Sequence, residues 1–260
     1  MRIRNKRAER QQYLFALRQM VTRETKRKYA RSYLGVVWSV LSPLLNMSVM
    51  SLVFSTIFVR SIDKFPIYLF TGTLIYSLFS DATSHGMSAL VDNRSMILKT
   101  KFSKQTFVIA RVLTALSNFG YSFVVYVVLL FVFRIRPTWY MLLFPIPVVF
   151  MVLFATGIAL GLSVIYVFFA DIKHLYSVFL RLLHYLCALF YPADRLSGTM
   201  RHVLDLNPVY NYILFARDVM LYGVMPEPIL WLKIISWGTV SFCFGYWLFH
   251  HMENNIMQKM

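Results

Sequence analysis

Long apolar segments alternate with short polar ones along almost the whole chain. The apolar stretches long enough to be membrane spans lie at about 36–59, 65–90, 112–133, 141–168, 175–191 and 229–249. A bilayer core is about 30 Å thick, and a helix of about 20 apolar residues crosses it. The pattern therefore predicts an all-α integral membrane protein with six transmembrane helices, built as one domain over residues 1–260.

The composition supports a bilayer as the surrounding solvent. The chain is 58% hydrophobic and 15% charged, with a mean hydropathy of +0.58, whereas a soluble domain carries about 25% charged residues. The net charge of +16 is concentrated beside apolar blocks. It therefore favours anionic lipid headgroups over nucleic acid as the partner. A polyanionic substrate is the other explanation that this charge allows.

The first 31 residues form a basic leader. Its eleven Lys and Arg precede an apolar block that starts only at residue 36, unlike the early, short apolar core of a signal peptide. Its apolar side chains recur at helical spacing, and they are Tyr13, Leu14, Leu17, Met20 and Val21. We expect an amphipathic helix on the membrane surface over residues 1–31; a disordered basic tail is the alternative.

A compact cationic cluster ends this leader where the inner leaflet begins. It consists of Lys26, Arg27, Lys28 and Arg31. Charge-assisted hydrogen bonds from such a cluster would hold a diphosphate. Contact with phospholipid headgroups explains the cluster equally well.

Counting Lys and Arg predicts the orientation. With the N-terminus inside, segments 1–35, 91–111, 171–181 and 250–260 carry 19 of the 27 bases, and the segments on the other side carry 8. Cytoplasmic segments of membrane proteins are enriched in Lys and Arg. The bias therefore predicts a cytoplasmic-membrane protein with both termini in the cytosol.

Residues 91–111 are too polar to span a membrane. They carry five bases and one acid, interleaved with apolar side chains such as Met96, Ile97 and Phe107. This pattern predicts short helices that lie along the membrane and face a soluble partner.

Residues 192–228 contain no apolar run of span length. They predict two short helices separated at Leu206-Asn207-Pro208. Asn207 suits a helix cap, and Pro208 suits the first helical position. We expect an external re-entrant hairpin before the last span, because such backbone survives at membrane depth only when protein or a wet cavity surrounds it.

Motifs for nucleotide or metal chemistry are missing from the chain. Neither GxxxxGKS nor GxxxxGKT occurs, nor HExxH or GxSxG. Asp81 is the one acid well inside a predicted span, whereas proton-coupled carriers bury several. We expect no catalytic residue, no metal site and no bound cofactor. An ATP-independent flippase or a membrane enzyme of glycan assembly would need intramembrane acids or a catalytic cluster.

Aromatic residues make up 17% of the chain and gather on the first and fifth predicted spans. The candidates are Trp38, Phe54, Phe58, Tyr176, Phe179, Tyr185, Phe190 and Tyr191. Aromatic faces stack on sugar rings, but they also pack against lipid. Arg181 lies within the fifth span, where it either snorkels to the surface or faces a polar path.

Several stretches resemble one family over nearly the full chain. They are KRKYARSYLGVVWSVLSPLLNMSVMSLVFSTIF, FPIYLFTGTLIYSLFSDAT, VDNRSMILKTKFSKQTFVIAR, FFADIKH and LNPVYNYILFARDVMLYG. Together they are similar to the membrane subunit of ATP-binding-cassette exporters for O-antigen, capsular polysaccharide and teichoic acid. One departure is KFSKQTF, where relatives commonly have a Pro after the Phe.

The resemblance implies a channel between two copies of the chain, driven by two separate ATPase subunits that bind ATP and Mg²⁺. The substrate would be a glycan or polyol-phosphate polymer on undecaprenyl diphosphate. The lipid diphosphate would enter beside Arg27, Lys28 and Arg31, the aromatics of spans one and five would line the channel, and the hairpin at about 196–222 would cap it outside. Docking on the ATPase would involve Asp92, Asn93, Arg94, Ile97, Lys99, Lys101, Phe102, Lys104 and, as a smaller contact, Asp171. A permease for small lipids or drugs with the same fold is the alternative.

Overall fold

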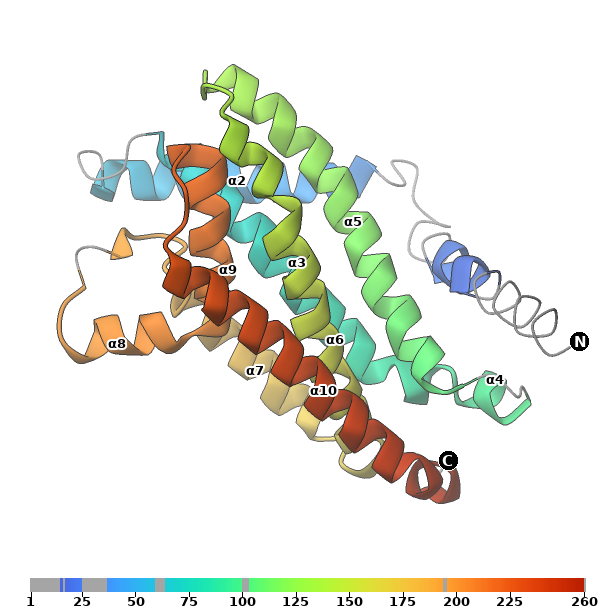
Figure 1. Cartoon of the computed structure of the whole chain (residues 1–260). Coiled ribbons are helices and arrows are strands. Elements are labelled where there is room, and N and C mark those ends of the chain that lie inside the picture. The colour runs from blue at the N-terminus through green and yellow to red at the C-terminus, as the bar shows by residue number, and fades with distance from the viewer. Residues whose placement is uncertain are drawn as a thin grey trace, which may run out of the picture.

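The computed structural model describes residues 15, 17–24, 37–58, 64–99, 103–193 and 196–259. These residues form helices and turns, with no strand among them (Figure 1). In chain order, the helices are α2 (Val37–Phe58), α3 (Phe65–Asp92), α4 (Arg94–Lys99), α5 (Gln105–Val132), η1 (Trp139–Leu143), α6 (Pro145–Phe168), α7 (Ile172–Tyr185), α8 (Thr199–Leu206), α9 (Pro208–Arg217), η3 (Asp218–Tyr222) and α10 (Pro228–Lys259). The all-helical prediction is confirmed for this part of the chain.

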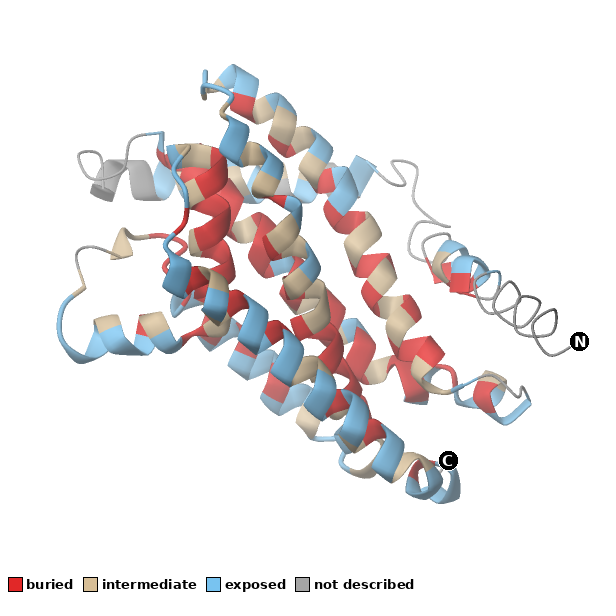
Figure 2. Ribbon diagram, viewed as in Figure 1, coloured by how far each residue is buried: buried red, intermediate tan, exposed pale blue. Residues whose placement is uncertain are grey.

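Helices α3 and α6 form the centre of the bundle. Helix α3 packs against α5, α6 and α9, and α10 packs along α6. Figure 2 shows buried residues on the facing sides of these helices, whereas α8 is mostly exposed. The core therefore lies around α3 and α6.

Small residues bring the central helices close together. A methyl group at Gly86 of α3 would lie 2.6 Å from the Cβ of Ala159 on α6. One at Gly157 of α6 would overlap the Ser241 carbonyl of α10, and one at Gly245 of α10 would overlap the Gly157 carbonyl. Close backbone approach through small residues is a common way for membrane helices to associate.

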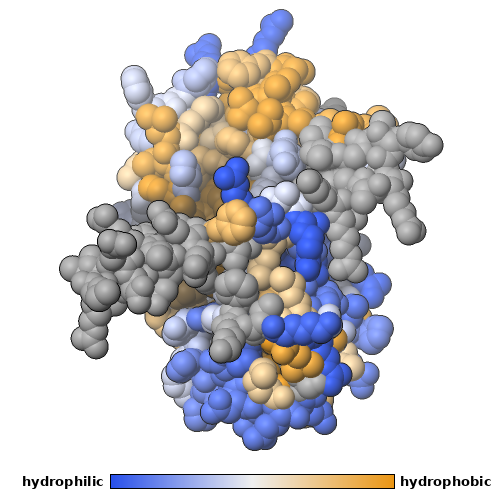
Figure 3. Space-filling model, turned by 90° about the vertical axis from the view of Figure 1, so that its right-hand side faces the viewer, coloured by the Kyte–Doolittle hydropathy of each residue, from blue (hydrophilic) through white to orange (hydrophobic). Residues whose placement is uncertain are grey.

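Ion pairs and hydrogen bonds join polar segments at the two ends of the helix bundle. At one end Lys104 Nζ lies 2.9 Å from Glu253 Oε1, and Arg111 lies 2.7 Å from the carboxylate of Glu24. At the other end Lys64 Nζ donates to the Arg134 carbonyl at 3.4 Å. Figure 3 shows hydrophilic surface at the end near α4 and the C-terminus, with apolar surface beyond it. Three of the four segments that charge counting placed on one membrane side thus lie at the same end of the bundle.

The predicted break at residues 206–208 is confirmed. Helix α8 ends at Leu206 and α9 begins at Pro208. The side-chain oxygen of Asn207 accepts hydrogen bonds from the N–H groups of Val209 (3.0 Å) and Tyr210 (3.4 Å). Asn207 therefore satisfies two amide groups that a helix start otherwise leaves unpaired.

Three helices within the described residues are long and apolar enough to cross a bilayer. They are α5, the continuous segment Trp139–Phe168, and α10. Helix α3 has 28 residues but a more polar sequence. Helix α2 forms over its predicted range, yet it runs across α3 and α5 rather than along them (Figure 1).

The fifth predicted span is shorter than expected. Helix α7 has 14 residues, about 21 Å of helix, and it ends at Tyr185 rather than at Tyr191. Leu186 is the C-cap, and Ala188 in the turn that follows has a positive φ of 47°. Tyr68 and Arg217 donate hydrogen bonds to the Ala188 carbonyl, at 3.3 and 3.0 Å. Contacts with distant segments thus stop a helix that apolar composition alone would continue.

The polar loop at 91–111 is also shorter than expected. Helix α3 continues to Asp92 and α5 starts at Gln105, so α4 is the one short helix described between them. Arg111 and Asp92 face each other across the two helices at 3.2 Å. Asp92 and Arg111, which the sequence analysis placed in a loop, therefore belong to the ends of the long helices α3 and α5.

Candidate functional site

A stripe of hydroxyl groups runs along one face of α3, and Asp81 adjoins it. These side chains follow one another at intervals of three or four residues, as one helix face requires; they are Thr73, Ser77, Ser80, Ser84 and Ser88. The interval from Thr73 to Ser88 covers about 22 Å of helix. The Ser77 hydroxyl donates to the Thr73 carbonyl at 2.6 Å, and the Ser88 hydroxyl donates to Asp92 at 2.8 Å. Two cavities open along this stripe.

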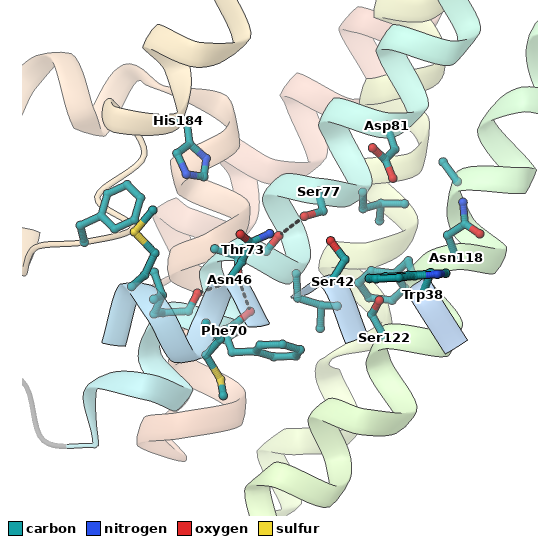
Figure 4. A pocket seen from close by; sticks show the side chains of 18 residues that line it. Trp38, Ser42, Asn46, Phe70, Thr73, Ser77, Asp81, Asn118, Ser122 and His184 are labelled. Carbon is teal, nitrogen blue, oxygen red and sulfur yellow. Dashed lines mark hydrogen bonds between the residues drawn. The ribbon is translucent and has the colours of Figure 1, made fainter. Parts of the chain in front are cut away.

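The first cavity, called here the α2 cavity, has a volume of about 620 Å³ and lies between α2, α3, α5 and the turn after α7. Its polar lining comes from three helices, and it consists of Ser42, Asn46, Thr73, Ser77, Asp81, Asn118 and Ser122. Trp38, Asn118 and Ser122 lie toward one end, and His184 lies at the other (Figure 4). Hydroxyl, amide and aromatic groups in one cavity are suited to a ligand rich in hydroxyl groups.

The second cavity, called here the α7 cavity, has a volume of about 760 Å³ and lies between α3 and α7. Helix α3 contributes Ser80, Ser84, His85 and Ser88, and α7 contributes Lys173, Ser177 and Arg181. Tyr76, Tyr176 and Tyr185 add aromatic rings, and His184 lines both cavities. The two cavities therefore meet beside His184 and share the polar face of α3.

Specific contacts hold α7 against α3. The Tyr176 hydroxyl donates to Thr83 Oγ1 at 2.7 Å, and the Tyr76 hydroxyl donates to the Leu180 carbonyl. The His184 ring packs edge-on against Tyr76, with centroids 4.7 Å apart. Many other side chains of α7 are exposed, including apolar ones such as Leu182 at 60%. A lipid or a second protein surface must therefore cover the outer face of α7.

Arg217 forms a buried polar node that sequence reasoning missed. Its side chain is 2% exposed and lies over the Tyr68 ring, 3.5 Å from the centroid. The guanidinium donates to the Tyr68 hydroxyl at 2.8 Å and to the Ala188 carbonyl at 3.0 Å. A methyl group at Gly72 would lie 2.7 Å from the guanidinium, so only glycine leaves it room. The node joins α9, α3 and the turn after α7 where these segments meet beside the cavities.

A second polar network joins the leader to the end of α3. Glu24 pairs with Arg111, which also contacts Asp92. Arg23 donates to the Asn93 side chain at 2.6 Å. The described part of the leader buries Leu17 and exposes Arg18, so it is amphipathic. The leader and the α3–α4 turn therefore form one connected surface.

The structure separates the predicted aromatic residues into two groups. Trp38 and Phe190 line the α2 cavity, and Tyr176 and Tyr185 line the α7 cavity. Phe179 lies outside both linings and is 49% exposed. Tyr191 also lies outside them, and its hydroxyl donates to the Tyr185 carbonyl at 2.9 Å.

The predicted docking residues differ in accessibility. Arg94, Lys99 and Asp171 are exposed, and so is Asp92, although it pairs with Arg111. The other described members have contacts within the chain or are buried, and they are Asn93, Ile97 and Lys104. The predicted residues Lys26, Arg27, Lys28, Arg31, Lys101 and Phe102 lie outside the described residues, as do the side chains of Phe54 and Phe58.

A signal for the α3 stripe was present in the sequence. Hydroxyl residues at helical spacing inside an apolar segment mark a polar face, and the prediction considered Asp81 alone. For Arg217 the sequence offered a basic residue in a short amphipathic helix, which is ordinarily exposed. Neither signal shows by itself which helix covers the face.

Residues 16–221 match the family described as ABC-2 type transporter. The chain belongs to this family. It is 31% identical to the O-antigen export system permease protein RfbA of Myxococcus xanthus, over 86% of this chain and 88% of that protein. It is 26% identical to a protein of the same name from Klebsiella pneumoniae, over 82% and 83%. It is 19% identical to the polysialic acid transport protein KpsM of Escherichia coli, over 90% and 92%.

Membership of the ABC-2 family makes the chain a membrane permease of the polysaccharide-exporter type that its sequence resembles. In a permease, the polar face of about 22 Å on the central helix α3 is best interpreted as a surface that borders water or substrate. Polar side chains are costly against lipid, so they gather where a permease keeps water or substrate.

Proposed function

We propose that the chain is the channel-forming permease of an ATP-driven exporter. Its substrate is an undecaprenyl-diphosphate-linked polysaccharide or teichoic acid, which crosses the cytoplasmic membrane. The related proteins named for O-antigen export and polysialic acid transport support a glycan substrate.

The α3 stripe is the observation that carries this proposal. It connects two cavities that together present hydroxyl, amide and aromatic groups. A polymer of sugars or polyol phosphates offers hydroxyl groups along its length, and these exchange hydrogen bonds with such a surface without needing one fixed register. An apolar drug could not exchange hydrogen bonds with these hydroxyl and amide groups.

Two copies of the chain and two ATPase subunits complete the exporter in this proposal. The apolar faces that α2 and α7 expose, with Leu52 at 73% and Leu182 at 60%, supply surface for a second copy or for lipid. The two copies would bring their α2 and α7 segments to a shared channel.

The ATPases would bind on the cytosolic side, at the end that holds α4 and the C-terminus. Arg94 and Lys99 of α4 are exposed there. Closure of the ATPase pair would move α4, and the Asp92–Arg111–Glu24 network would transmit the movement to the leader. In this topology the chain has six spans, its hairpin at 192–228 is external and both termini are cytosolic.

Stimulated ATP hydrolysis tests the proposal. The permease is reconstituted with its partner ATPase and given lipid-diphosphate-linked glycan or teichoic-acid precursors. Selective stimulation by one precursor class supports a polymer exporter and identifies the substrate. If neither class stimulates an intact complex, the function shifts to export of small lipids or drugs, for which cavities of 620 and 760 Å³ are also large enough.

A further inference from the structure

The α7 cavity differs in charge from the α2 cavity. Its lining contains the cations Lys173 and Arg181 and, among the described residues, no carboxylate. The α2 cavity contains Asp81 and neither Lys nor Arg. An anion would therefore be favoured in the α7 cavity and disfavoured near Asp81.

Helix geometry places these cations on the face of α7 that lines the cavity. Lys173, Ser177 and Arg181 are four residues apart, so they follow one face over about 12 Å. The exposed apolar side chains Val178 and Leu182 point elsewhere on the same helix. Arg181 thus faces the serine hydroxyls of α3 rather than the apolar surface of its own helix.

The donors around these cations suit a phosphate group. A guanidinium presents paired N–H donors that match phosphate oxygens, and an ammonium adds a compact charge. The Ser80 and Ser84 hydroxyls of α3 line the same cavity and can donate to further oxygens, whereas the Ser177 hydroxyl already donates to the His174 carbonyl at 2.8 Å. The Tyr185 ring at the cavity is 64% exposed, so a sugar attached to the phosphate would meet an aromatic face.

The apolar exposed face of α7 indicates that the phosphate is carried by a lipid. Leu175, Val178 and Leu182 are 66%, 47% and 60% exposed beside the cationic face. A lipid tail would lie along these side chains while its headgroup entered the cavity.

We propose that the α7 cavity binds the phosphate or diphosphate headgroup of a lipid-linked substrate, with Lys173 and Arg181 as the binding cations. This inference rests on the proposed function and adds a binding site for the lipid phosphate to it. The phosphate stays beside α7, and the attached sugars continue along the α3 stripe toward Trp38.

Binding of short lipid phosphates tests the site directly. The full-length permease in phosphatidylcholine nanodiscs is titrated with farnesyl diphosphate, farnesol or short-chain phosphatidylglycerol, and binding is measured by native mass spectrometry. Farnesyl diphosphate should bind most tightly, because farnesol lacks the anion. The Lys173→Gln/Arg181→Gln variant should bind farnesyl diphosphate at least tenfold more weakly and farnesol unchanged.

A control variant separates the site from overall charge. Arg136→Gln/Lys259→Gln removes the same charge at exposed positions outside the cavity lining, and its affinity should match the unaltered protein. Ser84→Ala is a smaller change that serves as the test if the double variant does not fold. It should lower the affinity for farnesyl diphosphate by a few fold. Equal binding by the Lys173/Arg181 variant and the control would overturn the site.

Three further outcomes are informative. If phosphatidylglycerol binds as tightly as farnesyl diphosphate and loses affinity equally, the cavity holds membrane phospholipid and the substrate assignment is overturned. If lipid-linked glycan stimulates ATP hydrolysis equally with and without Lys173 and Arg181, the proposed polymer export is supported and the proposed phosphate site is refuted. If lipid-linked glycan stimulates neither the unaltered nor the altered complex although farnesyl diphosphate binds selectively, the phosphate site is supported and the proposed polymer export is refuted.

Discussion

Replacing Tyr68 by Phe tests the buried node around Arg217. The substitution keeps the ring under the guanidinium and removes only the hydroxyl. That hydroxyl accepts from Arg217 at 2.8 Å, and its one proton is shared between the carbonyls of Tyr191 (3.1 Å) and Ala188 (3.3 Å). A hydrogen bond to a charged group contributes about 1.5–3 kcal/mol and a neutral one about 0.5–1.5 kcal/mol. We expect Tyr68→Phe to lower the free energy of unfolding by about 2–4 kcal/mol.

A larger change at the same position extends this test. Tyr68→Leu also removes the cation–π contact, which is worth about 2 kcal/mol when desolvated. The further loss should be of that size, because Arg217 is 2% exposed and gains no water in exchange. The order of stability is therefore unaltered protein, then Tyr68→Phe, then Tyr68→Leu.

Unfolding of the purified full chain by sodium dodecyl sulfate in mixed micelles, followed by circular dichroism, measures these differences. Tyr140→Phe is the matched control, because Tyr140 is 39% exposed. A Tyr68→Phe variant within 0.5 kcal/mol of this control, a margin of about half a neutral hydrogen bond, would refute the role given to the node.

Four further substitutions address packing, transport and partner binding. Gly157→Ala should sharply reduce the folded yield, because the added methyl group would overlap the α10 backbone; size-exclusion chromatography measures this. Trp38→Ala and Tyr185→Ala should each impair polymer export or let ions leak, because each removes an aromatic ring from a cavity; a reconstituted export and ion-flux assay reports both. Lys99→Glu should weaken ATPase binding, because Lys99 is exposed on α4; co-purification measures it.

Each of these predictions has a contrary result. Gly120→Ala is the control for Gly157, since a methyl group there meets nothing within 4 Å; equal yields of the two variants would contradict the packing argument. Normal export without ion leakage by the Trp38→Ala and Tyr185→Ala variants would show that these two rings do not line the transport path. Unchanged co-purification of the Lys99 variant would exclude Lys99 from the docking surface.

The sequence alone determined where most helices form. Apolar length and local chemistry act within a segment, so the helices over 145–168 and 208–217 and the cap at Asn207 follow from neighbouring residues. The same local reasoning extended α7 beyond Tyr185, because apolar composition carries no sign of the distant donors that bind the Ala188 carbonyl.

Only the tertiary structure decided which polar side chains act together. The spacing of Thr73, Ser77 and Ser84 is readable in the sequence, but α2, α5 and α7 determine that this face opens onto cavities rather than onto packed protein. Arg217 is buried because Gly72 and Tyr68 make room and partners for it from 145 and 149 positions away. Contacts between segments so far apart depend on how the helices pack, and local pattern does not encode that packing.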